Sequence, residues 1–216
     1  MSSTSVVTSH LQSKERVRRP GAIVLDGGRV AFRVWAPHCR EISVVFVGSD
    51  TWTQRLSSDG DGWFEAVIEG IAPDARYQFV LDGLHQRPDP ASRFQPEGVH
   101  GPSQIFNPHE YEWRNAGWTG LDLDKYVLYE LHVGTFTREA TFGAVIPRLD
   151  ELKDLGVTAI EIMPVAQFPG SRNWGYDGVA PYAAQNSYGG PLELQRLVDA
   201  CHERGLAAVG DRKSVV

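Results

Sequence analysis

The chain has 216 residues, of which 42% are hydrophobic and 22% are charged, and its formal net charge is −6. This length can bury one or two cores, and the acidity argues against nucleic acid or an anionic membrane surface as a partner. Its apolar runs are shorter than the ~20 residues that a membrane-spanning helix needs. With Cys39 and Cys201 far apart, neither a disulfide scaffold nor a Cys/His metal site is predicted, and a reducing cytoplasm fits both thiols.

Residues 1–20 form the first distinct segment of the chain. They are rich in Ser, Thr and Arg and lack the apolar stretch of a secretory signal. This composition predicts a disordered extension, with a transit peptide as the alternative.

From residue 21 to residue 108 the pattern is that of short strands. Apolar residues alternate or cluster in 31–35, 42–46, 63–68 and 77–81, and Gly, Asp and Ser separate these runs. Such spacing predicts an all-β, immunoglobulin-like sandwich of antiparallel strands. The Pro-rich end of this region, from about residue 85, has no period and is predicted to be an irregular connector.

Trp35, Trp52 and Trp63 lie in or beside these strands. At least two of them are expected in the core of the sandwich. Alternatively, the three indoles could form a platform for sugar rings, which would make the sandwich a non-catalytic glucan-binding module.

After residue 125 strands and helices alternate. Apolar runs at 126–133 and 157–165 have the length of buried strands, and a third begins at Leu206. Helical spacing of apolar residues predicts helices over 141–156 and 191–205 between them. A β-α-β-α-β order is typical of a parallel sheet, as in a TIM barrel or a doubly wound fold.

Three residues mark details of these helices. Thr141 is expected to cap the first helix, and Pro147 marks either its true start or a kink. Cys201 lies in the apolar stripe of the second helix and is expected to be a buried free thiol.

A long loop, 166–190, follows the second predicted strand. It mixes aromatic and polar side chains, namely Trp174, Tyr176, Asp177, Tyr182, Asn186 and Tyr188. In a barrel this loop would lie at the carboxyl ends of the strands, where active sites form. Aromatic rings stack on pyranose rings, and amides and carboxylates bind hydroxyls, so the loop predicts a sugar site around residues 174–177. Tyr182 and Tyr188 are expected to pack the loop instead.

Three further polar residues interrupt the apolar strands. Glu130 and His132 are two residues apart and share a face, either near a substrate or as a polar pair that structures the mouth of the barrel. Glu161 is expected to be a buried carboxylate with a partner.

Five segments resemble the α-amylase superfamily of glycoside hydrolases, and they occur in the order and at the spacing of that superfamily. They are FRVWAP (32–37), RPDPASRFQPEGVHGPSQ (87–104), YELHVGTFT (129–137), LGVTAIEIMPVAQFPGSRNWGYDGV (155–179) and YGGPLELQRLVDACHERGL (188–206). Within that superfamily, NWGYDG at 173–178 is similar to the trehalohydrolases, and the glycogen branching enzymes come next.

The resemblance implies a domain organisation and an activity. It implies a carbohydrate-module-like β-sandwich over 21–108, a linker over 109–124 and the first three strands of a (β/α)8 TIM barrel over 125–210. It also implies a cytoplasmic hydrolase of trehalose metabolism that cleaves the α-1,4 bond beside the trehalose end of maltooligosyl trehalose, without metal or organic cofactor. A fragment of a branching enzyme, which also acts on α-glucan, is the alternative.

The same resemblance implies roles for four residues. Tyr176 would stack on the sugar in subsite −1, Trp174 and Asp177 would shape that subsite, and His132 would lie against the substrate. In the superfamily, the aspartate nucleophile follows strand four, the glutamate that serves as general acid follows strand five, and a further aspartate follows strand seven. These positions come after the first three strands, so no catalytic residue is expected in this chain. It is accordingly expected to be an inactive N-terminal fragment with a truncated or non-native tail over 211–216, in which only Asp211 falls on a superfamily motif.

Overall fold

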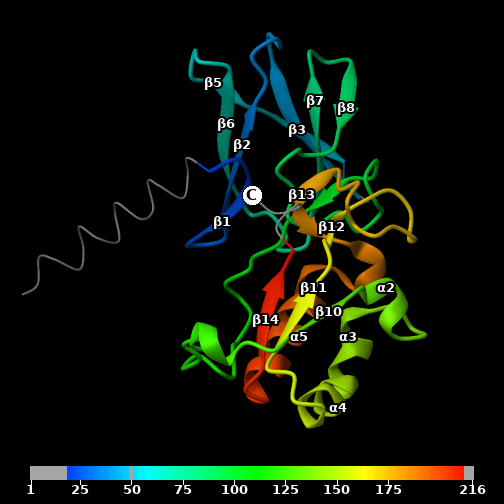
Figure 1. Cartoon of the computed structure of the whole chain (residues 1–216). Helices are drawn as coiled ribbons and strands as arrows, with labels where there is room; N and C mark the ends of the chain where they lie inside the picture. Colours follow the sequence, from blue (N-terminus) through cyan, green and yellow to red (C-terminus); the bar gives the residue numbers. More distant parts are fainter. Residues whose placement is uncertain (1–18, 49–50, 212–216) are drawn as a thin grey trace, which may run out of the picture. The chain divides into compact units, whose positions relative to one another are not determined.

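The computed structural model describes residues 19–48 and 51–211 (Figure 1). The expected N-terminal extension lies almost entirely outside the described residues, as does the expected tail from residue 212. The chain divides into two compact units, one formed by residues up to 93 and 100–107, the other by 94–99 and the residues from 108 onward. No helix in the described ranges has the length and apolarity needed to cross a bilayer.

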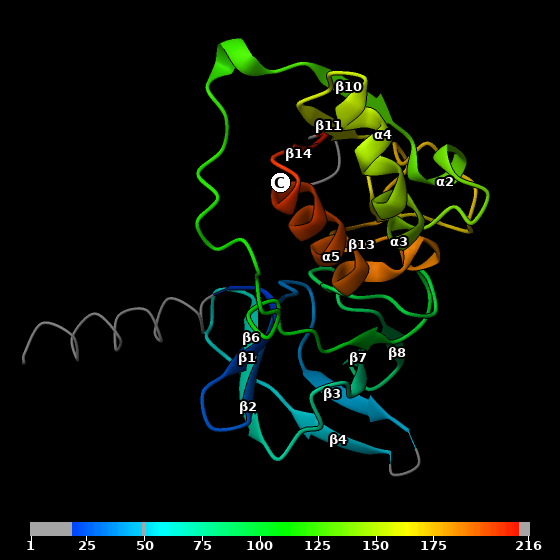
Figure 2. The same cartoon turned by 90° about the horizontal axis from the view of Figure 1, so that it is seen from below.

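Unit 1 is a sandwich of two antiparallel sheets (Figure 2). One sheet has the order β1-β2-β6-β5 and the other β4-β3-β7-β8, with β9 also paired to β7. The bounds are β1 (Gly21–Leu25), β2 (Arg29–Trp35), β3 (Ile42–Val47), β4 (Trp52–Arg55), β5 (Ser57–Ser58), β6 (Trp63–Glu69), β7 (Arg76–Leu81), β8 (His85–Arg87) and β9 (Ser103–Gln104). Alternate residues such as Phe32, Val34, Ile42 and Val44 point inward and form the core, as the period of two requires.

The three tryptophans of unit 1 are outside this core, so the expectation that at least two are core residues is wrong. Trp35 is 59% exposed, Trp52 is 40% exposed and Trp63 is half-buried. The reason is register, because Trp35 and Trp63 pair across β2 and β6 at outward positions. There the guanidinium carbon of Arg33 lies 4.1 Å from the centroid of Trp63.

A buried carboxylate organises the Pro-rich end of unit 1. Asp89 is 2% exposed and accepts hydrogen bonds from the Tyr77 hydroxyl (2.6 Å) and the Ala91 N–H (2.8 Å). Its own N–H donates to the Ser103 hydroxyl (3.0 Å). These bonds fix a segment that has little regular secondary structure, as buried polar groups do when they are satisfied.

The free energy of unfolding of unit 1 should depend on pH through Asp89. Burial raises the pKa of Asp89 to about 6, although hydrogen bonds from Tyr77 and Ala91 lower it, against an ordinary value of 3.8. A raised folded-state pKa stabilises the fold below the unfolded pKa, and this stabilisation is lost as the pH rises through the folded value. Between about pH 4 and pH 7, the loss should be on the order of 3 kcal/mol.

Urea denaturation of the intact chain, followed at the β2 and β7 amide resonances, measures this dependence. Asp89→Asn keeps the shape of the side chain and cannot titrate, so the difference between the two chains isolates Asp89. A difference that is constant with pH would contradict the prediction.

Unit 2 is built on a parallel sheet of order β10-β11-β14 (Figure 1). A two-stranded antiparallel sheet, β12-β13, follows β11. The strands are β10 (Leu128–Leu131), β11 (Ala159–Ile162), β12 (Ala166–Gln167), β13 (Ala180–Ala184) and β14 (Ala207–Gly210), and the helices are α2 (Val133–Phe136), α3 (Phe142–Val145), α4 (Leu149–Asp154) and α5 (Gly190–Glu203). Short 3-10 turns are η1 (Leu123–Lys125), η2 (Ile146–Arg148) and η3 (Asn186–Tyr188).

The first predicted helix is broken in two at Pro147. The Thr141 hydroxyl accepts the Ala144 N–H (3.2 Å), which confirms the predicted cap of α3. The 3-10 turn η2 contains Pro147 and separates α3 from α4. Proline has no N–H for a helical bond, so the chain changes pitch there instead of continuing as one α-helix. Cys201 in α5 is fully buried and free, also as expected.

The parallel sheet has one apolar and one acidic face. Leu131, Ile160 and Ile162 pack with α3, α4 and α5 in a buried core. On the opposite face Glu130 is exposed and pairs in register with Glu161, which is half-buried. The expectation that Glu161 is a buried carboxylate is therefore wrong, because the helices pack on the other face of the sheet and leave Glu161 half-buried beside Glu130.

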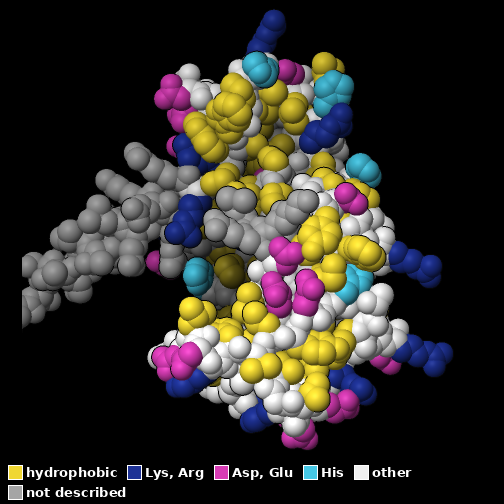
Figure 3. Space-filling model, viewed as in Figure 1, with side chains coloured by type: hydrophobic (Ala, Val, Ile, Leu, Met, Phe, Trp, Pro, Cys, Tyr) yellow, Lys and Arg dark blue, Asp and Glu magenta, His cyan; other side chains and the backbone are white. Residues whose placement is uncertain are grey.

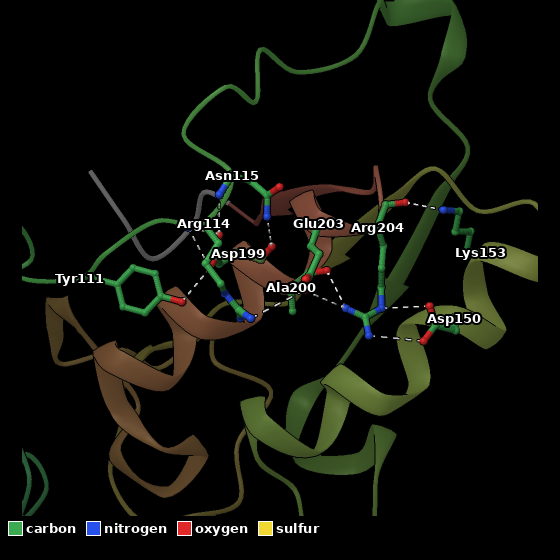
Figure 4. Close-up of polar contacts among 9 residues, drawn as sticks. All are labelled: Tyr111, Arg114, Asn115, Asp150, Lys153, Asp199, Ala200, Glu203 and Arg204. Carbon is green, nitrogen blue, oxygen red and sulfur yellow. Dashed lines mark hydrogen bonds and ion pairs between the residues drawn. The ribbon is translucent and has the colours of Figure 1, made fainter.

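The segment before β10 is held against α5 by one carboxylate (Figure 4). Asp199 is fully buried and accepts hydrogen bonds from the Tyr111 hydroxyl (3.0 Å), from the Arg114 N–H and Nε (3.2 and 3.0 Å) and from the Asn115 N–H (3.3 Å). One turn further along α5, the ring of His202 stacks on Trp118 with a centroid distance of 4.7 Å. Residues 109–124, expected as a linker, thus form part of unit 2.

Candidate functional site

The candidate site is the loop between β12 and β13, at the carboxyl ends of the parallel strands. His132 follows β10 directly, and Asp211 follows β14. Two fully buried amides fix the base of the loop: the Phe168 N–H donates to Gln185 Oε1 (2.9 Å), and the Asn186 N–H donates to Gln167 Oε1 (2.9 Å). The exposed part of the loop therefore rests on a rigid base.

His132 uses both ring nitrogens in contacts within the protein. Its Nε2 lies 2.8 Å from the carbonyl oxygen of Asn173 and 3.0 Å from the Tyr188 hydroxyl, and its Nδ1 lies 3.0 Å from Thr135 Oγ1. A carbonyl can only accept, so Nε2 carries the proton in this arrangement. Of the two roles left open by the sequence, the geometry corresponds to the polar group that structures the mouth of the site.

Asn173 and Gly175 define the shape of the exposed turn. The Asn173 side chain accepts the Gly175 N–H (2.7 Å) and donates to Asp177 Oδ2 (2.9 Å). Gly175 has φ +94°, and a Cβ there would lie 1.8 Å from the carbonyl oxygen of Pro164. Only glycine fits this close approach of two backbones.

Tyr176 reaches across the site to the end of β14. Its hydroxyl donates to Asp211 Oδ2 (2.9 Å). This hydrogen bond raises the pKa of Tyr176, and burial and the charges of Asp211, Glu130 and Glu161 raise it further. The phenol therefore stays protonated, and it lies within the field of three carboxylates at the acidic face of the sheet.

The aromatic side chains of the loop differ in exposure. Trp174 is 70% exposed, Tyr176 40% and Tyr182 46%, whereas Tyr188 is 1% exposed and packs edge-on against Phe142 and Phe168. Packing is thus confirmed for Tyr188 but is wrong for Tyr182. Figure 3, viewed as in Figure 1, shows acidic side chains gathered over the parallel sheet beside hydrophobic ones. Such a surface can stack on the apolar face of a sugar and accept hydrogen bonds from its hydroxyls.

The structure brings together Trp174, Tyr176 and Asp177 in one turn. His132 is connected to this turn by its hydrogen bond to Asn173, which also bonds to Asp177. Sequence reasoning missed Asn173, although its spacing to Gly175 is that of an Asx turn. No cluster of three or more His, Cys, Asp or Glu side chains suited to a metal ion occurs within residues 19–48 and 51–211.

Two domain families match the chain. Residues 20–93 match carbohydrate-binding module 48 (isoamylase N-terminal domain), and residues 109–212 match the alpha amylase catalytic domain. The crystal structure of a Salmonella typhimurium protein assigned to the alpha amylases superposes with a TM-score of 0.85 at 45% identity, covering 89% of this chain and 32% of that one. By these matches the chain is similar to members of the α-amylase superfamily, with residues 20–93 corresponding to a carbohydrate-binding module and residues 109–212 to part of a catalytic domain.

Within that superfamily the sequence is similar to malto-oligosyltrehalose trehalohydrolase. The Saccharolobus solfataricus enzyme is 46% identical over 187 residues, which are 87% of this chain and 33% of the relative. The 1,4-alpha-glucan branching enzyme GlgB of Corynebacterium jeikeium is 32% identical over 88% of this chain and 29% of its own length. The chain spans about a third of the length of these curated relatives.

More distant structures share the fold. A pullulanase from Anoxybacillus sp. LM18-11, solved with maltotetraose, superposes with a TM-score of 0.75 at 20% identity over 89% of this chain and 34% of that one.

Proposed function

We propose that this chain supplies sugar-binding residues to a trehalohydrolase that releases trehalose from maltooligosyl trehalose in the cytoplasm. The observation that carries the proposal is the turn of Trp174, Tyr176 and Asp177 at the carboxyl ends of three parallel strands, tied to Asp211 by a hydrogen bond. The similarity to trehalohydrolases supports the choice of substrate. An α-glucan chain presents the alternation of apolar ring faces and hydroxyls that this turn can bind.

Each residue has a distinct part in the proposed site. Trp174 and Tyr176 offer ring faces, and Asp177 offers a carboxylate oxygen to sugar hydroxyls. His132 holds the turn through Asn173 instead of donating to the sugar, because both of its nitrogens are already engaged. We further propose that β10, β11 and β14 are the first three strands of a (β/α)8 barrel, and that the immunoglobulin-like sandwich precedes it.

The 216-residue chain is expected to release no trehalose from maltooligosyl trehalose. Glycosidases need a carboxylic acid and a second carboxylate on either side of the scissile bond. By the superfamily resemblance, both of these carboxyl groups would follow strands that come later in the barrel than β10, β11 and β14. Chromatography of reaction products from the purified chain tests this, and trehalose above the level of a buffer blank would refute it.

Binding is the activity that the chain itself should show. Trp174→Ala removes the most exposed ring of the turn, and we expect the affinity for maltotetraose to fall at least about tenfold. Leu155→Ala is the matched control, because Leu155 is 74% exposed but precedes β11, toward the amino ends of the parallel strands and away from the turn. Titration by NMR measures both, and equal affinities in the two variants would contradict the proposed site.

The alternative is a branching enzyme, which the similarity to GlgB supports. The two functions differ in the sugar that the site prefers. A trehalohydrolase site should bind maltooligosyl trehalose more tightly than the maltooligosaccharide of equal length, whereas a branching enzyme site should not distinguish them. A second, non-catalytic sugar platform on the tryptophans of unit 1 would bind glucan even when Trp174 is replaced.

A further inference from the structure

We propose that Asn173 is the positioning residue that holds Trp174 and Asp177 in the orientation required by the site. The inference rests on the proposed function for its consequence in glucan binding, but its structural part stands on contacts alone. Asn173 is half-buried and makes four polar contacts, two through its side chain and two through its carbonyl oxygen.

The side-chain amide connects the two ends of the turn. Its oxygen accepts the Gly175 N–H at 2.7 Å, and its nitrogen donates to Asp177 Oδ2 at 2.9 Å. The Gly175 N–H can bond only to the amide oxygen, and the Asp177 carboxylate can bond only to the amide NH2 group. These two partners therefore determine the orientation of the Asn173 amide. The Asn173 amide therefore closes the turn and also fixes the orientation of the Asp177 carboxylate.

The carbonyl oxygen connects the turn to the parallel sheet. It accepts from His132 Nε2 at 2.8 Å and lies 3.4 Å from the Tyr188 hydroxyl. His132 follows β10, and Tyr188 is fixed in the core. The exposed turn is thus held by rigid elements through the backbone of the same residue whose side chain shapes it.

Asparagine is the side chain that fits these demands. The position needs one acceptor and one donor on a single short planar group, and aspartate supplies two acceptors instead. In Asn173→Asp the bond to the Gly175 N–H can persist, but two carboxylates then face each other at hydrogen-bond distance. Like charges at that distance repel, so Asp177 and the turn should leave their positions.

Exchanging the two residues restores the hydrogen bond with its direction reversed. In the double variant Asn173→Asp/Asp177→Asn, the amide at position 177 donates to the carboxylate at 173, which still accepts the Gly175 N–H. A residue that merely packs would not show this reciprocal rescue, because neither single change alters the volume of its side chain appreciably.

The test uses the indole N–H resonance of Trp174 in the 216-residue chain, assigned with Trp174→Phe. We expect Asn173→Asp to shift or broaden this resonance and to weaken maltotetraose binding at least tenfold, and the double variant to return the resonance to its wild-type position. Ser171→Asp adds a charge at an exposed position of the same loop and should leave the resonance in place. If Asn173→Asp does not fold, Asn173→Ser keeps an acceptor for Gly175 but lacks the donor to Asp177, and it should weaken binding with a smaller shift.

A wild-type indole resonance in Asn173→Asp, or a double variant that resembles Asn173→Asp, would overturn the inference. Failure of the proposed function looks different: maltotetraose would then leave the wild-type Trp174 resonance unchanged, while the single and double variants would still differ from each other.

Discussion

Replacing Asp199 with alanine should lower the free energy of unfolding of unit 2 by about 2–4 kcal/mol. The carboxylate is fully buried and receives hydrogen bonds from Tyr111, Arg114 and Asn115, three residues of the segment that precedes β10. Its loss removes their common acceptor and leaves two backbone N–H groups without that partner. Figure 4 shows these contacts between the segment and α5. Without them the segment should detach from α5 before the rest of unit 2 unfolds.

Urea denaturation and amide hydrogen exchange at residues 111–115 measure these two effects. Tyr111→Phe removes one of the hydrogen bonds and should cost about 1 kcal/mol. Asp150→Ala is the control for charge, because Asp150 binds Arg204, the residue that follows α5, but is largely exposed, and such pairs contribute little. If Asp199→Ala were no more destabilising than Asp150→Ala, the buried carboxylate would not be the anchor.

Acid should act on the same anchor. Burial alone would raise the pKa of Asp199, but the hydrogen bonds from Arg114 and Tyr111 outweigh it and hold the pKa below its ordinary 3.8. A depressed folded-state pKa contributes stability above the unfolded value, and that stability is lost as the pH falls through the folded value. The difference in the free energy of unfolding between wild type and Asp199→Ala should therefore become smaller as the pH falls below 3.8.

The periodic parts of the chain were predictable because each pattern has one local cause. Alternation in β2 and β3 and the apolar run of β11 follow directly from the period of strands and from burial. The Thr141 cap and the interruption at Pro147 follow from the hydrogen bonds that each residue can or cannot make. Each of these signals is carried by residues that lie close together in the sequence.

Elements that depend on distant contacts were missed. The strand β12 has two residues and is paired across an irregular register to β13, so it has no period to detect. Asp199 lies in a helix where a carboxylate would ordinarily face solvent, and only residues 84–88 positions earlier make it a buried anchor. Trp35 and Trp63 read as core residues by composition, but the register between their strands turns both outward.

The sequence indicated which residue types form the candidate site, but not which contacts hold them in place. The aromatic and carboxylate residues at 174–177 indicated a sugar surface, as one turn of the structure now presents them. Its support comes from Asn173, from the buried amides of Gln167 and Gln185, and from Tyr188. These residues act by geometry, and their types alone do not distinguish them from ordinary packing and loop residues.

Gly175→Ala should be the most damaging small change within the site. The added methyl would lie 1.8 Å from the Pro164 carbonyl oxygen, which is backbone and cannot turn away, and alanine is strained at φ +94°. The turn must therefore move, which should lower the free energy of unfolding by about 2–4 kcal/mol and the affinity for maltotetraose at least about tenfold.

Gly170→Ala in the same loop separates the two causes. Gly170 also has a positive φ of 75°, but a Cβ there meets no heavy atom within 4 Å. It should therefore cost only the backbone strain, about 1 kcal/mol, and leave binding within about twofold. Urea denaturation and NMR titration of both variants decide the matter: equal effects would mean that strain at positive φ, and not contact with Pro164, fixes the turn. Loss of binding confined to Gly175→Ala would show that the close approach of two backbones holds Trp174 and Tyr176 in place.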